Sequence, residues 1–289
     1  MKPVRRRIVR WADGRAHGAA DTLAAEEPLE LRVDTRSLAV VMRTPGHDDE
    51  LAAGFLLTEG LVRRRADMRA IETNRRNRQG NVLDVFLAPD VPLDFARLTR
   101  HVFASSSCGL CGAASIAAVR RQFPPVRADF RVAPETLLAL PERMRAAQAD
   151  FAATGGLHAA ALFTVGGELL CLREDIGRHN ALDKVLGRAL LDDALPLDRH
   201  VLLVSGRVSF ELVQKALAGG IACIAAVGAP SSLAVDFARR NGQTLAGFLR
   251  DGRFNLYAGA GRMQVPAAQG RLRKATLRTR GGRLKAPPG

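Results

Sequence analysis

The stretch from residue 201 to 249, VLLVSGRVSFELVQKALAGGIACIAAVGAPSSLAVDFARRNGQTLAGFL, alternates short apolar runs with amphipathic segments. The apolar runs predict buried strands at Val201–Val204, Ile221–Val227 and Thr244–Leu249, and the segments between them predict helices at Phe210–Leu217 and Leu233–Arg239. Buried strands that alternate with helices are typical of parallel βαβ units. This half of the chain therefore predicts an α/β domain.

The residues just before this stretch extend the same domain. His158–Val165 and Glu168–Leu172 flank the turn Gly166-Gly167 and predict a hairpin, followed by a helix over Asn180–Leu191. A further helix is expected over Glu135–Phe151, closed by Gly155-Gly156. A hairpin next to parallel strands makes the expected sheet mixed, although largely parallel.

The first part of the chain has a different pattern, typical of an α+β domain. We expect strands at Leu29–Val33, Leu38–Met42 and Asn81–Leu87, the last after the turn Gln79-Gly80, and a helix at Asp48–Thr58. The expected division is a smaller N-terminal domain over 1–103, a CxxC loop, helix and linker over 104–129, an α/β domain over 130–262, and a basic, disordered tail over 263–289.

Composition excludes some classes of protein. The chain has 289 residues, 47% of them hydrophobic, which suits a folded globule with a sizeable core. Neither end carries an apolar run long enough for a bilayer or a signal peptide, so we expect a cytoplasmic protein with no membrane contact.

The net charge of +14 is concentrated in the tail. Residues 262–285 hold eight basic and no acidic residues, which leaves +6 for the rest of the chain. With one Trp and one Tyr, the chain lacks the stacking aromatics of single-strand binders, so a nucleic-acid partner is not expected.

Two of the four cysteines lie in Ser105–Gly112, SSSCGLCG, among small residues that leave sulfur accessible. A thiol in a CxxC pair commonly has a lowered pKa, and the thiolate attacks electrophiles, binds metals or carries a second sulfur. Cys108 lies farther out on this loop, whereas a helix beginning near Ala113 would favour the thiolate of Cys111. The spacing alone leaves both residues as candidates for catalysis.

Other uses of this pair find less support. A thioredoxin-like oxidoreductase needs the pair directly after a core strand, and Phe103-Ala104-Ser105 is a poor strand end. No second CxxC completes a zinc site, so we expect no metal ligands, and the His-x-Glu signature of the zinc deaminases is absent. Cys171 and Cys223 lie in apolar runs, where cysteine usually acts as a small buried hydrophobe.

Polar residues are concentrated where four predicted strands end. In open α/β sheets, ligands bind at the carboxyl ends of the strands, where helix N-termini and arginine forks favour phosphate. Four such groups at one sheet edge indicate a phosphorylated, nucleotide-like ligand, although any one group could simply cap a helix. The groups are Arg173–Asp175 with Gly177–Asn180, Ser205–Arg207, Ala229–Ser232 and Arg250–Arg253.

Three residues near this edge have open roles. A lone histidine near a strand end is more often structural, but His179 stands between Arg178 and Asn180, which also makes it a candidate ligand contact. Lys184 and Lys215 are two of only five lysines in an arginine-rich chain, and each is as consistent with a phosphate contact as with a surface charge.

Several of these segments together resemble one family. The quoted CxxC run, REDIGRHNALDK at 173–184, SGRVSFELVQK at 205–215, APSSLAV at 229–235 and GFLRDGR at 247–253 occur in the order typical of the FdhD family of formate dehydrogenase accessory sulfurtransferases. The resemblance covers about residues 28–262 and leaves the basic tail outside.

The resemblance implies a fold, a reaction and a set of partners. The second domain would be cytidine deaminase-like and the protein a homodimer. Sulfur would pass from a cysteine desulfurase, as a persulfide on Cys108 with Cys111 as second cysteine, to the bis-molybdopterin guanine dinucleotide form of the molybdenum cofactor before its insertion into formate dehydrogenase. A guanine nucleotide such as GDP would mimic this bound substrate. A chaperone that only delivers the cofactor remains an alternative.

The cofactor contacts implied by the resemblance lie in one segment, Phe248, Leu249, Arg250, Asp251, Gly252 and Arg253. The other expected contacts come from the strand ends and the two lysines described above: Arg178, His179, Asn180, Lys184, Ser205, Arg207, Lys215, Ser231 and Ser232.

Overall fold

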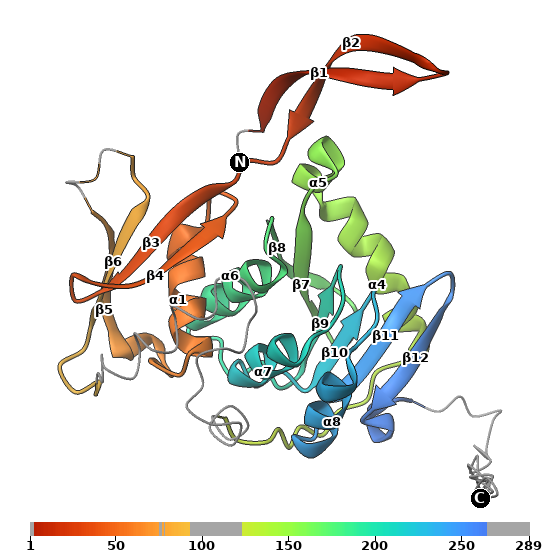
Figure 1. Cartoon of the computed structure of the whole chain (residues 1–289). Coiled ribbons are helices and arrows are strands. Elements are labelled where there is room, and N and C mark those ends of the chain that lie inside the picture. The colour runs from red at the N-terminus through yellow and green to blue at the C-terminus, as the bar shows by residue number, and fades with distance from the viewer. Residues whose placement is uncertain (1–2, 75–76, 78, 93–122, 265–289) are drawn as a thin grey trace, which may run out of the picture.

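The computed structural model describes residues 3–74, 77, 79–92 and 123–264. This part of the chain forms a six-stranded and a four-stranded sheet with helices packed between and around them, and a separate two-stranded hairpin (Figure 1). The strands are β1 (Val4–Ala12), β2 (Arg15–Leu23), β3 (Glu27–Val33), β4 (Arg36–Arg43), β5 (Met68–Thr73), β6 (Val82–Leu87), β7 (His158–Thr164), β8 (Leu169–Asp175), β9 (His200–Val204), β10 (Cys223–Ala226), β11 (Thr244–Arg250) and β12 (Arg253–Ala258). The α-helices are α1 (Asp48–Thr58), α4 (Pro134–Ala147), α5 (Ala149–Thr154), α6 (Arg178–Leu191), α7 (Phe210–Ala218) and α8 (Ser232–Arg240).

The larger sheet has the strand order β12-β11-β10-β9-β7-β8. Its centre is parallel, β9 with β10 and β10 with β11, as the βαβ pattern predicted. The three outer pairings are antiparallel, so the sheet is mixed as expected but less parallel than expected. The difference comes partly from β12, which sequence analysis did not predict: the left-handed residues Asp251 and Gly252 form a tight turn that folds it back on β11.

Helices cover both faces of this sheet. One core cluster joins the sheet to α6, α7 and α8, and a second cluster joins its other face to α4 through Leu137, Leu140 and Met144. The helix predicted over Glu135–Phe151 is interrupted at Gln148, where α4 ends and the short α5 begins at an angle to it (Figure 1). The break matters because it brings α5 over the edge of the sheet.

The four-stranded sheet, β4-β3-β6-β5, belongs to the N-terminal α+β part. Strands β3, β4 and β6 and helix α1 confirm the three strands and the helix predicted there. Its helix α1 packs against α6 of the C-terminal part, and the first core cluster runs without a break from Leu29 in β3 to Leu245 in β11. The two parts therefore share one hydrophobic core. The expected boundary segment over 104–129 lies mostly outside the described residues and stays a prediction.

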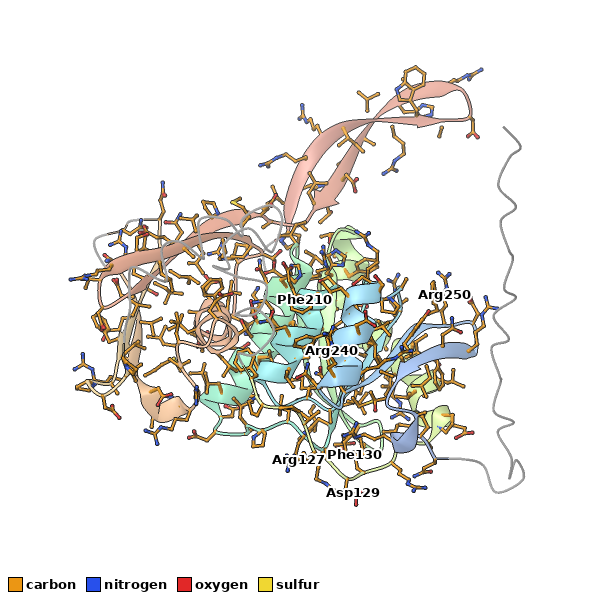
Figure 2. The ribbon with its side chains drawn as sticks, turned by 60° about the horizontal axis from the view of Figure 1, so that its bottom comes forward. Arg127, Asp129, Phe130, Phe210, Arg240 and Arg250 are labelled. Carbon is orange, nitrogen blue, oxygen red and sulfur yellow. The ribbon has the colours of Figure 1, made fainter. Side chains whose placement is uncertain are left out.

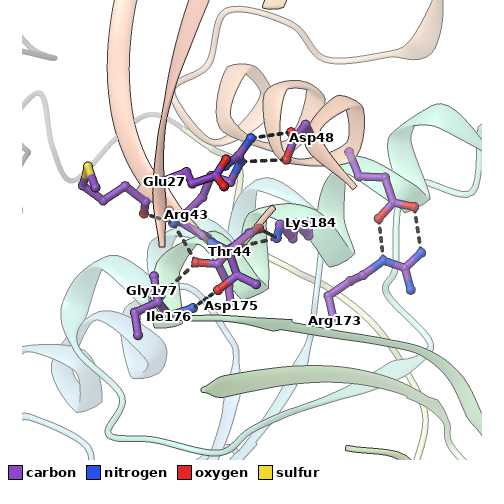
Figure 3. Close-up of polar contacts among 12 residues, drawn as sticks. Glu27, Arg43, Thr44, Asp48, Arg173, Asp175, Ile176, Gly177 and Lys184 are labelled. Atoms are coloured by element: carbon purple, nitrogen blue, oxygen red, sulfur yellow. Dashed lines mark hydrogen bonds and ion pairs between the residues drawn. The ribbon is translucent and has the colours of Figure 1, made fainter. Parts of the chain in front are cut away.

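Buried ion pairs reinforce this junction (Figure 3). Lys184 of α6 is 1% exposed, and its Nζ lies 2.7 Å from an Asp175 carboxylate oxygen and donates to the Thr44 carbonyl at 2.9 Å. Arg173 of β8 binds Glu50 of α1 through two hydrogen bonds of 2.5 and 2.7 Å. Each of these buried charges forms an ion pair or a hydrogen bond, which offsets the cost of removing it from water.

The hairpin β1–β2 extends away from the rest of the molecule (Figure 1). It was not predicted, because residues 4–23 are rich in Arg and Ala and have no apolar alternation to mark a buried face. In the described ranges, no helix is long and apolar enough to cross a membrane.

Candidate functional site

Four strands of the large sheet end at the same edge. Strands β9, β10 and β11 are parallel, and β8 points the same way because β7 runs antiparallel to both β8 and β9. The polar groups that follow these four strands are therefore brought to one edge, as predicted. Figure 2 shows one of them, Arg250, at the outer end of the β11–β12 pair.

The loops at this edge are held together by their backbones. The Gly228 N–H donates to the Gly206 carbonyl at 3.2 Å, and the Gly228 carbonyl accepts from Phe248 N–H at 3.0 Å. A Cβ at Gly228 would lie 2.7 Å from the Gly206 oxygen, so only glycine permits this approach. The edge is thus a fixed, backbone-lined surface rather than a set of independent loops.

A cavity of about 740 Å³ opens beside this edge on the side covered by α4 and α5. A cavity of this size accommodates a nucleotide-sized molecule. Its sheet side is formed by His158, Ser205, Val227, Arg250 and Asp251. Its helical side is formed by Pro141, Glu142, Met144, Arg145, Gln148, Phe151 and the Gly155–Leu157 turn.

Glu174 of β8 positions the helical wall. Its carboxylate accepts hydrogen bonds from the backbone N–H groups of Asp150 and Phe151, at 3.1 and 2.8 Å, at the start of α5. A carboxylate at this place satisfies free donors and interacts favourably with the helix dipole. The guanidinium of Arg145 then lies 4.4 Å from the centre of the Phe151 ring, so the wall combines an aromatic ring with a positive charge.

Positive charge gathers where the cavity meets the strand ends. Burial lowers the pKa of His158 below its usual value, and the charges of Arg178 and Arg207 lower it further. Within the described part of the chain, the buried Nε of Arg178 has no hydrogen-bond partner. Arginine forks at a strand edge are suited to an anion, whose arrival would offset the mutual repulsion of the two guanidinium groups.

His179 is held by a carboxylate on the next helix. Its Nε2 lies 3.0 Å from Glu211 Oε2 and 3.4 Å from Ser209 Oγ, both at the start of α7. The hydrogen bond from His179 lowers the pKa of Glu211. The pair orients the imidazole at the edge, next to Arg178.

The segment Phe248–Arg253 has an unusual backbone. Phe248 and Asp251 both have φ of 54°, a left-handed conformation that costs energy for residues other than glycine. The Arg250 guanidinium lies 5.7 Å from the centre of the Phe248 ring. Arg250, Asp251, Gly252 and Arg253 are exposed at the end of the sheet, where a ligand can reach them.

Two of the expected ligand contacts, Lys184 and Lys215, are engaged in buried ion pairs. Lys184 is paired with Asp175 as described, and Lys215 Nζ lies 2.8 Å from Asp183 and donates to Thr58 Oγ1 at 2.8 Å. Their ammonium groups hold α6 and α7 to the N-terminal part. Neither lysine is an ordinary surface charge, because both ammonium groups neutralise buried carboxylates.

Three more expected contacts have structural partners. Asn180 Nδ2 donates to Asp175 and to the Met42 carbonyl, at 2.9 and 2.8 Å. Ser231 caps α8 by accepting from Ala234 N–H at 3.2 Å, and the Leu249 side chain is fully buried in the core. We leave these side chains and the two lysines out of the proposed ligand contacts.

The remaining expected contacts stay accessible. Ser205 lines the cavity while its Oγ accepts from the Ala159 N–H at 2.9 Å, and Arg207 and Ser232 are exposed at the edge. Sequence reasoning missed the residues of α4 and α5 and missed His158. A single sequence carries no signal for which face of α4 or α5 lies over the strand ends.

Of the four cysteines, only Cys171 and Cys223 belong to the described residues, where both are free thiols. Burial raises the pKa of Cys171 and raises that of Cys223 to about 12, which agrees with the inert role predicted for them. Cys108 and Cys111 lie outside the described residues. The described ranges contain no cluster of three or more His, Cys, Asp or Glu side chains that could hold a metal.

The fold and this edge together define a two-part α/β protein with a cavity at the carboxyl ends of its parallel strands. The chain belongs to the FdhD/NarQ family, which it matches over residues 24–264. The resemblance found from the motifs is therefore confirmed.

Curated relatives are similar over nearly their whole length. The sulfur carrier protein FdhD of Streptomyces coelicolor is 53% identical over 278 residues, which cover 92% of this chain and 97% of that protein. The protein of the same name from Saccharolobus solfataricus is 40% identical over 253 residues, covering 86% and 94%. A crystal structure from Desulfotalea psychrophila, described as a candidate formate dehydrogenase accessory protein, has the same fold, with a TM-score of 0.73 and 24% identity over 91% of this chain and 99% of that one.

Proposed function

We propose that this protein is a sulfurtransferase that carries sulfur as a cysteine persulfide from a cysteine desulfurase to the molybdenum cofactor destined for formate dehydrogenase. The observation that carries the proposal is the cationic, cavity-bearing sheet edge in a member of a family whose curated relatives are named sulfur carrier proteins. Sulfur transfer is assigned to the CxxC pair, and binding of the cofactor is assigned to the sheet edge.

The first step assigned to the pair is an exchange at sulfur. The Cys108 thiolate attacks the terminal sulfur of the donor's persulfide, which forms a persulfide on Cys108 and releases the donor's thiolate. If Cys111 then attacks the inner sulfur of Cys108, the two cysteines form a disulfide and the terminal sulfur leaves as hydrosulfide for the acceptor. The two electrons that reduce the terminal sulfur come from the two thiols, so a second thiol nearby is useful to a carrier.

The acceptor is the bis-molybdopterin guanine dinucleotide cofactor, bound as substrate at the sheet edge. Arg178, His179 and Arg207 are assigned to its phosphates, with Ser205 and Ser232 as further polar contacts, because positive charge gathers here around the unpartnered Nε of Arg178. Within the segment Phe248–Arg253, Arg250 and Asp251 line the same cavity, and the Leu249 side chain is buried. GDP is the simplest probe of this site.

The partners follow from the same assignment. We propose a cysteine desulfurase as donor, formate dehydrogenase as client, a homodimer as the working form and the cytoplasm as its location, with no role for nucleic acid or membranes. The second domain is proposed to be cytidine deaminase-like in fold without the chemistry of a deaminase.

Mass spectrometry tests the sulfur step. The protein incubated with desulfurase and cysteine should gain the mass of one sulfur, and the gain should disappear in Cys108→Ala. Retention of the gain on Cys111 alone would exchange the roles of the two cysteines. If a variant lacking both still restored full formate dehydrogenase activity to a deletion strain, the protein would be a cofactor chaperone and not a sulfur carrier.

Equilibrium binding of GDP tests the edge. Arg178→Gln and Arg207→Gln should each weaken binding about tenfold or more, because each removes a charged partner of a phosphate. Arg199→Gln is the matched control, since this residue precedes β9 at the opposite end of the strand and donates to the Asp129 carbonyl. Equal binding by all three variants would move the nucleotide to another site.

A further inference from the structure

Gln148 is a buried residue whose side-chain amide is left without a partner among the described residues. It stands at the break between α4 and α5, is 4% exposed and lines the cavity beside the sheet edge. Its backbone carbonyl accepts from Ala152 N–H at 3.1 Å, but its side chain neither caps α5 nor forms another hydrogen bond within the described ranges. The free N–H groups at the start of α5 are bound by Glu174 instead. Because a buried polar group without a partner costs stability, an amide at this place indicates a ligand that supplies the partner.

Glu142 is a second polar side chain that this wall leaves free. It is exposed and lines the same cavity, and no ion pair or hydrogen bond to another described residue engages its carboxylate. Asp251, the other acidic residue at this cavity, has its carboxylate 3.9 Å from Arg250 Nε. A free carboxylate repels phosphate, so the helical wall suits a part of the ligand that donates hydrogen bonds.

The helical wall also offers flat groups for stacking. The Phe151 ring and the Arg145 guanidinium, 4.4 Å from the ring centre, both line the cavity. Aromatic rings and guanidinium planes are the side-chain groups on which nucleobases stack. The wall therefore combines a stacking surface, an amide and a hydrogen-bond acceptor, which together are suited to a base.

Guanine fits these groups better than adenine does. Along its hydrogen-bonding edge, guanine carries the acceptor O6 next to two donors, N1–H and the 2-amino group. A glutamine amide can donate to O6, and a carboxylate can accept from both donors. Adenine has an unprotonated N1 and no 2-amino group, so it would bring a lone pair against Glu142. The carboxylate therefore favours guanine.

We propose that this cavity holds a guanine base stacked on Phe151, with the Gln148 amide donating to O6 and the Glu142 carboxylate accepting from N1–H and the 2-amino group. Gln148 and Glu142 would thus determine the choice of base. The inference rests on the proposed function for the ligand, a guanine dinucleotide whose phosphates lie at the arginines of the strand ends. The helical wall then reads the base while the sheet edge holds the phosphates.

Equilibrium binding of GDP, IDP and ADP to the full chain tests the choice of base. The unmodified protein should bind GDP about tenfold or more tightly than ADP, and IDP, which lacks the 2-amino group, with intermediate affinity. Glu142→Gln should reduce the preference for GDP over ADP to about threefold or less. The matched control is Glu135→Gln, an exposed carboxylate in the first turn of the same helix, which should keep the preference unchanged.

Two further variants separate the roles of the other residues. Phe151→Leu should weaken the binding of all three nucleotides alike, because stacking does not distinguish bases. Gln148→Leu should weaken GDP binding about tenfold without lowering the urea midpoint of the free protein, because its amide holds no described residue in place. A lower midpoint together with weaker binding would assign Gln148 a structural role and overturn its part in the proposal.

The remaining outcomes distinguish this inference from the proposed function. Equal binding of GDP and ADP by the unmodified protein, an unchanged preference in Glu142→Gln, or a preference lost only in Asp251→Asn would place the base elsewhere. If Arg178→Gln still weakened GDP binding in that case, the phosphate site would stand and the base site alone would be refuted. Failure of the unmodified protein to bind GDP would refute both sites, whereas failure to gain sulfur from the desulfurase would refute sulfur transport and not the base site.

Discussion

Gly54 of α1 and Gly187 of α6 lie against each other where the two helices cross. A Cβ at Gly54 would lie 1.8 Å from the Asp183 carbonyl oxygen and 2.9 Å from Gly187 N, and a Cβ at Gly187 would lie 1.8 Å from the Glu50 carbonyl oxygen. Glycine at both positions lets the backbones touch. This crossing joins the N-terminal part to the helix that begins at the candidate site.

Gly187→Ala should therefore destabilise the protein by about 3 kcal/mol or more, since backbone atoms cannot give way as side chains can. Urea unfolding measured by circular dichroism checks the value. Gly166→Ala is the control, because its added Cβ would meet Thr164 Oγ1 at an ordinary 3.7 Å. An equal, small effect of both substitutions would mean that the helices are not in contact at this point.

Lys215→Met should cost about 3–5 kcal/mol, because it leaves the buried Asp183 carboxylate without its cation. The double variant Lys215→Met, Asp183→Leu should recover part of the loss, and urea unfolding of the three proteins gives the coupling. Arg188→Met, which removes an exposed pair with Asp192, should leave the midpoint nearly unchanged. No recovery in the double variant would argue that Asp183 has other partners that matter more.

Stability should fall as the pH is lowered from 7 towards 5. Burial lowers the pKa of His158, and the same direction holds for His47 and His200. At pH values between the histidine pKa of the folded state and that of the unfolded state, the unfolded chain binds more protons, so acid favours unfolding. The stabilisation is therefore fully present only above the pKa of the unfolded state.

Urea midpoints at a series of pH values measure this fall. His158→Gln should have a shallower slope than the unmodified protein, with the rest of the slope left to the other two histidines. A slope that is unchanged in His158→Gln would show that this imidazole titrates as it does in the unfolded chain.

Alkylation by iodoacetamide at pH 8 should separate the cysteines. Cys223, whose pKa is raised to about 12, should react only after unfolding, and Cys171 should react slowly because burial raises its pKa too. The thiols of the CxxC pair should account for the fast phase, which peptide mass mapping can assign. Rapid labelling of Cys223 in the folded protein would contradict its place in the core.

Much of the fold and part of the site were predictable from local pattern. The apolar runs of β9, β10 and β11 are visible because a buried strand must be apolar on both faces, and the glycine turns mark where neighbouring strands reverse. The motifs in Ser105–Gly112 and in 173–253 were enough to identify the family. The hairpin β1–β2 was not predictable, since a ribbon exposed on both faces has no apolar periodicity.

The sequence by itself determined the alternation of strands and helices, the family, and the positions of the polar groups at the strand ends, because these depend on residues close together along the chain. Only the tertiary structure decided what each polar side chain touches. Lysine is a residue type that often binds phosphate, yet Lys184 neutralises Asp175, 9 positions away in the sequence, and Lys215 neutralises Asp183, 32 positions away. Packing likewise placed Arg145 and Phe151 over the cavity, since which face of a helix is buried against a sheet edge depends on the whole core.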